Sequence, residues 1–389
     1  MSCYISSKEN RYYTALEQSF GYVPAVTEKN RLPGVKLDAS HVLEKVVRRD
    51  KTGGRTFVGL PDGLRSETRF ELTTYLTSWS AADAEPCYGP LLRAALGGSP
   101  LVYGGGTIDA LTGAQLRFVA PHGLTSGQGI SCGGEIRFAM ALIDDYEIVL
   151  NAPLTGDQAA GWPVDRTVTY WPAATLPSVS LFDYWSPAGA VQRIVAGAAV
   201  DQMKVEINGD FHELVFAGMG KDLIDSASFV SQQGGLTSFP VEPADAGYDY
   251  AVVPGNLGQA WLGTAPDQFF TLTKATVTVD NGLDMRSKEF GFTTPRCVVA
   301  GPRSVTADFN LFEMDDAATK ALYQAARQRS PVSAMFQLGQ QASQLCGVYL
   351  KSFVPEVPEF NDDQAQLEWR FQGSRAQGIL DDEIAIAFG

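Results

Sequence analysis

The chain has 389 residues, 45% of them hydrophobic, and a formal net charge of −14. This length can hold two or three domains with buried cores, so wholesale disorder is excluded, and 39 glycines and 21 prolines favour a turn-rich β architecture. An acidic chain is also a poor candidate for a protein that grips nucleic acid by neutralising phosphates.

Residues 1–34 are predicted to form an N-terminal arm. The segment is polar and dotted with aromatic residues, and it ends at Leu32-Pro33-Gly34. Gly21 and Pro24 would stop a helix soon after it began. We therefore expect an arm that becomes ordered mainly through contacts with other chains, so that its deletion leaves a folded protein unable to polymerise. The start of the chain lacks the pattern of a secretory signal, which favours synthesis in the cytosol.

Residues 35–225 are predicted to form a first β domain. The segment around Phe70 and Leu72 alternates apolar and polar residues, which is the period of a half-buried strand. Asn208-Gly209 between two such strands predicts a two-residue hairpin. Residues 99–177 have strand patterns of their own, so we expect a small β subdomain inserted at a surface connection, where long insertions cost little.

Residues 226–270 are rich in Gly, Pro and Ser and are predicted to form an irregular linker. A second β domain is predicted over 271–389, with a short helix over 315–328. Asp315 and Asp316 stand at the start of this helix, where its dipole favours negative charge. No run reaches the roughly 18 apolar residues of a membrane span, so we expect no membrane insertion.

The two predicted domains repeat one order of elements: strand, helix, strand, strand and a closing strand before a glycine. The five segments of the first domain are 66–72, 86–96, 178–185, 191–200 and 213–217, and those of the second are 304–312, 315–328, 332–338, 347–354 and 366–371. Repetition of this kind predicts that the working surface is built by symmetry. We expect the two domains to superpose, with 99–177 protruding from the first.

One short motif around Ser131 matches the pattern of a catalytic nucleophile. Gly129-Ile130-Ser131-Cys132-Gly133 matches GxSxG, but a nucleophile elbow needs a strand before the serine and a helix after it, and the following segment is strand-like. The three histidines, His41, His122 and His212, are dispersed, and only His212 follows the serine in the order of that hydrolase class. A serine hydrolase using Ser131 is therefore kept only as a minor alternative.

Other candidate motifs are weaker still. The glycine-rich stretch at 102–107 and Gly218–Lys221 both lack the spacing of a phosphate-binding loop. Five cysteines show no CxxC spacing and are expected to be reduced thiols: Cys3, Cys87, Cys132, Cys297 and Cys346. Paired acids at 144–145, 362–363 and 381–382 are typical of solvated turns. We therefore predict no catalytic residue, no cofactor and no metal site.

Residues 355–389 contain eight acidic residues against Arg370 and Arg375, which gives this segment a charge of −6. The excess favours either simple solubility or a negatively charged face that is repeated around an assembly.

The segments ALEQSFGYVPA, from Ala15, and ATVTVDNGLDMRSKEFGFTTPRCVVAGPRSVTADFNLF, from Ala275, resemble the tail tube (major tail) proteins of long-tailed bacteriophages. The resemblance covers the arm and the second domain, and more weakly the first. It implies β-sandwich domains, each with a short flanking helix, that form rings stacked into a tube for genome passage. Some members fuse two such domains, and the duplicated pattern here fits that variant.

The resemblance further implies the partners. These are other copies of the chain, in a ring of three that mimics a six-domain ring, other tail proteins, and phage DNA that passes without specific binding. An acidic bore would repel the DNA, so we expect more Asp and Glu than Lys and Arg along the channel. The alternatives are other ring components of the injection machine, namely a terminator, an adaptor or a baseplate hub. The location implied is the virion tail, after synthesis in the host cytoplasm.

Overall fold

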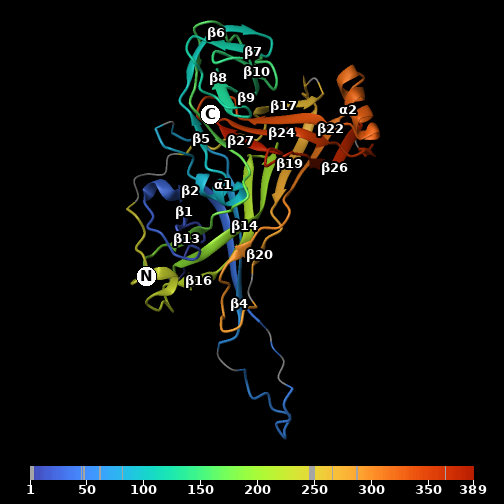
Figure 1. Ribbon diagram of the computed structural model, residues 1–389. Coiled ribbons are helices and arrows are strands. Elements are labelled where there is room, and N and C mark those ends of the chain that lie inside the picture. The colour runs from blue at the N-terminus through green and yellow to red at the C-terminus, as the bar shows by residue number, and fades with distance from the viewer. Residues whose placement is uncertain are drawn as a thin grey trace.

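The structure is a computed structural model that describes residues 4–44, 46, 49–60, 63–80, 82–244, 250–264, 266–285, 288–363 and 365–389. It is mainly β, with 45% strand and two short α-helices, as the sequence predicts. Long strands run through the body, a smaller sheet stands at one end, and residues 49–60 extend away from the other end (Figure 1). No helix among the described residues is long and apolar enough to cross a membrane.

One set of strands, which we name the first module, lies in the N-terminal part of the chain, on either side of a large insertion. Its elements are β1 (Asn10–Leu16), η1 (Glu28–Asn30), β2 (Arg31–Leu32), β3 (Gly34–Leu43), β4 (Ser66–Tyr75), α1 (Gly89–Leu96), β13 (Val179–Trp185), β14 (Arg193–Ile207), β15 (Glu213–Gly220) and β16 (Asp222–Asp225). One sheet has the order β3-β4-β15-β14, and the other has the order β2-β1-β13-β14-β16. Because β14 is long, its two halves serve the two sheets.

The second module lies in the C-terminal part of the chain. Its elements are β17 (Gly258–Gly263), β18 (Asp267–Gln268), β19 (Leu272–Asp280), β20 (Asp284–Met285), β21 (Val298–Val299), β22 (Ser304–Phe312), α2 (Ala317–Gln328), β23 (Val332–Leu338), β24 (Cys346–Val354), β25 (Glu359–Asn361), β26 (Glu368–Ala376) and β27 (Ala385–Phe388). One sheet has the order β19-β22-β26-β25, and the other has the order β18-β17-β23-β24-β27.

The two modules share one pairing scheme in one chain order. β3 and β4 correspond to β19 and β22, β15 corresponds to β26, and β14 corresponds to β24 together with β25. The alignment is fixed to the residue, because the register shift between Gly34 and Lys36 in the β3–β4 pair recurs between Leu272 and Lys274 in the β19–β22 pair. The domain boundaries at 35–225 and 271–389 stay a prediction.

The predicted arm and the predicted linker both contain strands. Residues 10–16 of the predicted arm form β1, which pairs along its full length with β13, and Tyr13 is buried at 1% exposure. Within the predicted linker, β17 pairs with β23 over six positions. The expectation that the arm becomes ordered mainly through other chains is wrong for β1, and the expectation of an irregular linker is wrong for β17, because each strand pairs with a strand far along the same chain. Segment 226–257 contains only a short 3-10 helix, η2 (Gln233–Gly235), among its described residues.

The modules are joined by main-chain pairing between β14 and β19. Gln202 to Ile207 pair antiparallel with Asp280 to Ala275, so the two four-stranded sheets become one sheet of order β3-β4-β15-β14-β19-β22-β26-β25. The apolar side of the junction belongs to the main core, since Met203, Val205 and Val277 are fully buried there. The junction is therefore packed like a protein interior.

The two helices cover apolar surface of this core. α1 has proline in its first turn and ends at Gly97 in the left-handed conformation, with φ of 94°. In α2, the side chain of Asp316 accepts a hydrogen bond from the Thr319 N–H at 2.7 Å, which caps the helix start. Leu322 and Ala326 of α2 are buried. The helix predicted over 315–328 is confirmed over 317–328, with Asp316 as the capping residue in front of it.

Most of the predicted insert forms a separate six-stranded sheet. Its strands are β6 (Gly106–Thr112), β7 (Gln115–Phe118), β8 (Gly129–Cys132), β9 (Glu135–Leu142), β10 (Glu147–Leu150) and β11 (Pro163–Val164). The flanking strands β5 (Leu101–Tyr103) and β12 (Thr167–Tyr170) pair with each other, and β12 also pairs with β27. The insert therefore packs on the second module, whereas protrusion from the first was expected.

Candidate functional site

The polar face of the eight-stranded sheet is a surface that both modules build together. Directly opposed residues on neighbouring antiparallel strands point to the same side, so the registers define this face. From Lys204 it runs through Val215 and Thr73 to Lys36 in one direction, and through Thr278 and Thr306 to Arg375 in the other. The opposite side of the sheet carries the buried core.

The polar face carries more acids than bases. Its acids are Asp38, Glu67, Glu71, Glu206, Glu213, Asp280, Asp308, Glu359 and Glu368, and its bases are Lys36, Arg69, Lys204, Lys274, Arg370 and Arg375. Nine acids against six bases leave three negative charges per chain on this face. All of these side chains are exposed or half-buried.

Several of the bases are held by acids of the same face. Arg69 contacts Glu67 at 2.8 Å, Lys36 contacts Asp38 at 2.6 Å, and Arg370 contacts Glu368 at 3.0 Å. Burial disfavours ionisation of Glu368, but hydrogen bonds from Arg370 and its neighbours outweigh that effect and hold the pKa of this carboxyl below its usual value. These pairs reduce the positive charge that the face presents to a ligand.

Two acids of the face oppose each other without a base between them. Glu206 on β14 pairs in register with Glu213 on β15. Partial burial, reinforced by the charge of Glu206, raises the pKa of the Glu213 carboxyl. Asp280 and Asp308 accept hydrogen bonds from the backbone N–H groups of Gly282 and Gly373, which fixes their positions.

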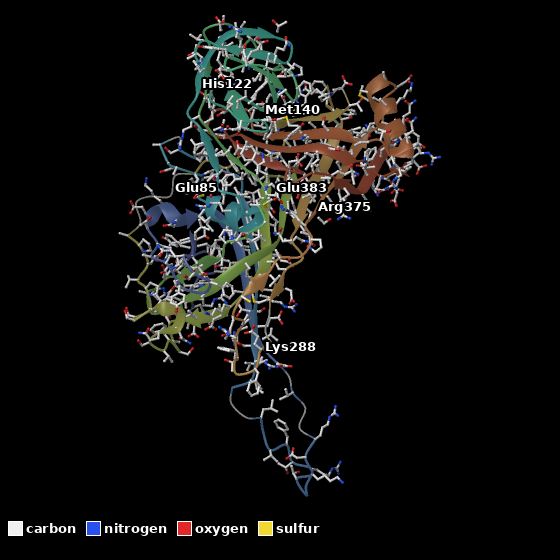
Figure 2. All side chains as sticks on the ribbon, in the orientation of Figure 1. Glu85, His122, Met140, Lys288, Arg375 and Glu383 are labelled. Atoms are coloured by element: carbon white, nitrogen blue, oxygen red, sulfur yellow. The ribbon has the colours of Figure 1, made fainter. Side chains whose placement is uncertain are left out.

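The structure places Ser131 outside any nucleophile elbow. Ser131 lies in β8, which turns at Gly133-Gly134 into β9, so the motif stands in a strand–turn–strand unit. Its side chain is fully buried. His122 is committed to the backbone: one ring nitrogen lies 2.9 Å from the Asp144 carbonyl oxygen, and the other accepts from the Leu124 N–H. His122 belongs to the inserted subdomain (Figure 2).

The remaining motifs also fall on β structure. The glycines at 104 and 105 connect β5 to β6, and Gly218–Gly220 lie within β15, so neither stretch leads into a helix that could hold a phosphate. His41 lies in β3, and His212 lies between β14 and β15, where its ring contacts the Leu257 carbonyl oxygen at 3.0 Å. Cys3 lies outside the described residues. Among those described, no group of three or more His, Cys, Asp or Glu residues is placed to hold a metal ion.

The acidic C-terminal segment divides between two roles. Asp381 and Glu383 contact Arg303 at 2.6 and 3.1 Å, and Asp382 contacts Lys351 at 2.9 Å, so these three acids form ion pairs within the second module. Glu359 and Glu368 instead lie on the polar face. The acidic residues of 355–389 thus contribute only part of the negative charge of the polar face.

A buried cluster fixes the insert to the second module. Arg137 of β9 is fully buried and pairs with Glu135, while it donates to Gln337 Oε1 at 2.9 Å and to Gln259 Oε1 at 2.8 Å. Its guanidinium carbon also lies 5.0 Å from the centre of the Trp261 ring. Burial lowers the pKa of Arg137 to about 10, which leaves it charged at neutral pH. Sequence patterns gave no sign of this cluster, whose members are far apart in the chain.

The comparison with known families agrees with this architecture. A profile described as phage tail tube protein matches residues 85–373, about three quarters of the chain. No curated protein matches. The match covers the first module from α1 onward, the insert and most of the second module, including most strands of the polar face. The chain therefore belongs to the phage tail tube protein family and is a structural component of the virion tail.

Proposed function

We propose that three copies of this chain close into a ring, and that the rings stack into a tube whose channel is lined by the polar face. Membership of the tail tube family supports self-association and contacts with other tail proteins. The observation that carries the proposal is the continuous eight-stranded sheet. Each chain contributes two equivalent four-stranded units, so three chains supply six units around a closed ring.

The charge of the polar face supports its assignment to the channel. Duplex DNA carries about one negative charge per 1.7 Å, and a lining with free cations would release counterions and retain it. On the polar face, three of the six bases, Lys36, Arg69 and Arg370, are each paired with an acid, and the nine acids of the face outnumber the bases. Such a surface lets DNA slide without specific binding. We also infer that the chain is made in the host cytoplasm and is then assembled into the tail.

A second candidate function uses the same fold. A terminator, an adaptor or a baseplate hub would also form a ring, but it would stop after one ring or a short stack.

The hydrolase alternative finds no support in the geometry of Ser131, and Ser131→Ala should leave any hydrolysis of an ester panel by the purified protein unchanged.

Electron microscopy of the purified full-length chain tests the proposal. We expect long tubes with three chains per ring and the polar face toward the channel. Short stacks of one or two rings would favour the terminator, adaptor or hub function. Six chains per ring would show that the duplication does not replace subunits, and a chain that stays monomeric at high concentration would contradict the proposal.

A further inference from the structure

The eight-stranded sheet ends in two strands that each have one neighbour. Among the described residues, β3 pairs with β4 alone and β25 pairs with β26 alone. Phe360 of β25 lies on the apolar side of the sheet and is accordingly open to solvent, at 57% exposure. Unpaired edges of this kind attract further strands and are normally protected in soluble proteins.

The chain itself contains the contact that would cover both edges. By the alignment of the modules, β3 corresponds to β19, and β25 corresponds to the second half of β14. β14 and β19 are paired with each other inside the chain, at the junction of the two modules. The unpaired edge of β25 is thus equivalent to the edge of β14 that binds β19, and the unpaired edge of β3 is equivalent to the edge of β19 that binds β14. These two edges lie at opposite ends of the sheet.

We propose that β25 of one chain pairs antiparallel with β3 of the next, in the register of the β14–β19 junction. This inference rests on the proposed ring and names the strands that close it. Within the chain, Lys204 stands opposite Thr278. The counterpart of Lys204 is Glu359, because the β14–β15 and β25–β26 pairs align without a gap. The counterpart of Thr278 is Ser40, because the β19–β22 and β3–β4 pairs align at their shared register shift. Phe360 then faces Ala39, and Asn361 faces Asp38.

The backbone around the two edges fits this register. The Leu37 N–H already donates to the hydroxyl oxygen of Tyr12 at 3.3 Å, so the edge of β3 is open only beyond that residue. The segment that corresponds to β14 is interrupted by Pro355 and Pro358, between β24 and β25. The prolines therefore confine the regular strand at this edge to Glu359–Asn361. These three residues meet the first three open residues of β3, at 38–40.

The side chains favour the same contact. In the internal junction, Val205 and Val277 are fully buried against each other's sheets. Their counterparts are Phe360, which already stacks on Trp369 with 5.5 Å between ring centres, and Ala39, which packs against the main core. Pairing would bury the exposed part of Phe360 and continue the apolar side of the sheet into the next chain.

The test is a disulfide trapped across the contact. Directly opposed residues on antiparallel strands have Cα atoms about 4.5–5.5 Å apart, a separation that a disulfide can bridge. The variant is Ser40→Cys with Glu359→Cys, in full-length chain carrying Cys297→Ser and Cys3→Ser to remove two thiols that could compete. Mild oxidation of assembled protein should convert most chains to covalent dimers and trimers on a non-reducing gel, with no larger species if the ring holds three chains.

Two control variants make the result decisive. Lys204→Cys with Thr278→Cys reproduces the internal junction and should form an intrachain bond. Lys36→Cys with Glu359→Cys uses the same face of β3 four residues out of register and should remain uncoupled. Coupling at residue 36 in place of residue 40 would overturn the register. Tubes in the microscope without coupling at residue 40 would overturn the inference and leave the ring intact, whereas absence of both tubes and coupling would overturn the ring as well.

Discussion

Glu206 on β14 and Glu213 on β15 lie directly opposite each other on the polar face. Two like charges directly opposite each other destabilise a sheet relative to neutral residues. The arrangement therefore places a local cost where the proposed channel needs negative charge.

The pH dependence of this pair gives the first prediction. The pKa of Glu213 is raised in the folded protein, so its ionised form is less favourable there than in the unfolded chain. Below the unfolded pKa both states are protonated and no cost exists; the cost develops as pH rises through the folded pKa and is complete above it. Glu213→Gln should therefore raise the melting temperature at pH 7 and leave it unchanged near pH 3.5. Glu206→Gln is the matched variant, and a double variant that gains the full sum of both would argue against coupling.

The second prediction concerns the buried cluster at Arg137. Arg137→Ala leaves Glu135 buried without its cation, and we expect a loss of about 3–5 kcal/mol of unfolding free energy. Arg117→Ala removes a solvent-exposed pair with Asp109 in the same inserted subdomain and should cost at most about 1 kcal/mol. Urea unfolding of both variants measures the difference. Equal losses would mean that the cluster does not hold the insert in place.

Truncation of the N-terminus tests the corrected role of the first residues. The Glu17 carboxylate, just after β1, accepts hydrogen bonds from the hydroxyls of Ser178 and Ser180 and from the Gly21 and Gly197 N–H groups. Removal of residues 1–34 deletes β1 and these bonds, so we expect insoluble or unfolded protein. Removal of residues 1–8, whose described part is exposed, should leave a folded chain. Circular dichroism and solubility of the two truncations provide the measurement. A soluble, folded chain lacking residues 1–34 would show that the arm serves contacts with other chains and not the fold of its own chain.

Local patterns predicted much of this fold because they need only neighbouring residues. The alternation around Phe70 predicted β4, and the acids at 315 and 316 predicted the start of α2. The hairpin at Asn208 is present, with φ of 64° at that residue, although its loop spans 208–212 because Phe211 pairs with Pro254. Composition also indicated an acidic surface.

What escaped prediction depends on partners that are distant in the chain. β1 pairs with β13, which lies some 170 residues away in the chain. The residues at 10–16 carry no pattern that favours a strand more than a helix. The acids of the polar face are spread one or two to a strand, so no charge run marks them. They form one surface only because the β14–β19 junction merges two sheets. The conspicuous acids at 381–383 instead form ion pairs with Arg303 and Lys351.

The last prediction reverses the charge of the proposed channel. Glu71→Lys with Glu206→Lys changes the polar face from three negative charges to one positive charge per chain. Both lysines should fit the sheet, because Glu71 stands opposite Asp38 and Glu206 stands opposite Glu213, so each substitution replaces a repulsive pair with an attractive one. We therefore expect stable chains that still assemble into tubes.

DNA passage should suffer while assembly does not. Each exposed lysine that meets a phosphate releases counterions and holds the DNA, with a strong dependence on salt. Phage carrying the variant should eject DNA about tenfold more slowly at 50 mM salt and recover toward the normal rate at 200 mM. Asp145→Lys with Asp157→Lys adds the same charge to exposed positions of the inserted subdomain and should eject normally. If the polar-face variant ejects DNA at the normal rate at both salt concentrations, the acidic balance of that face contributes to solubility and has no part in genome passage.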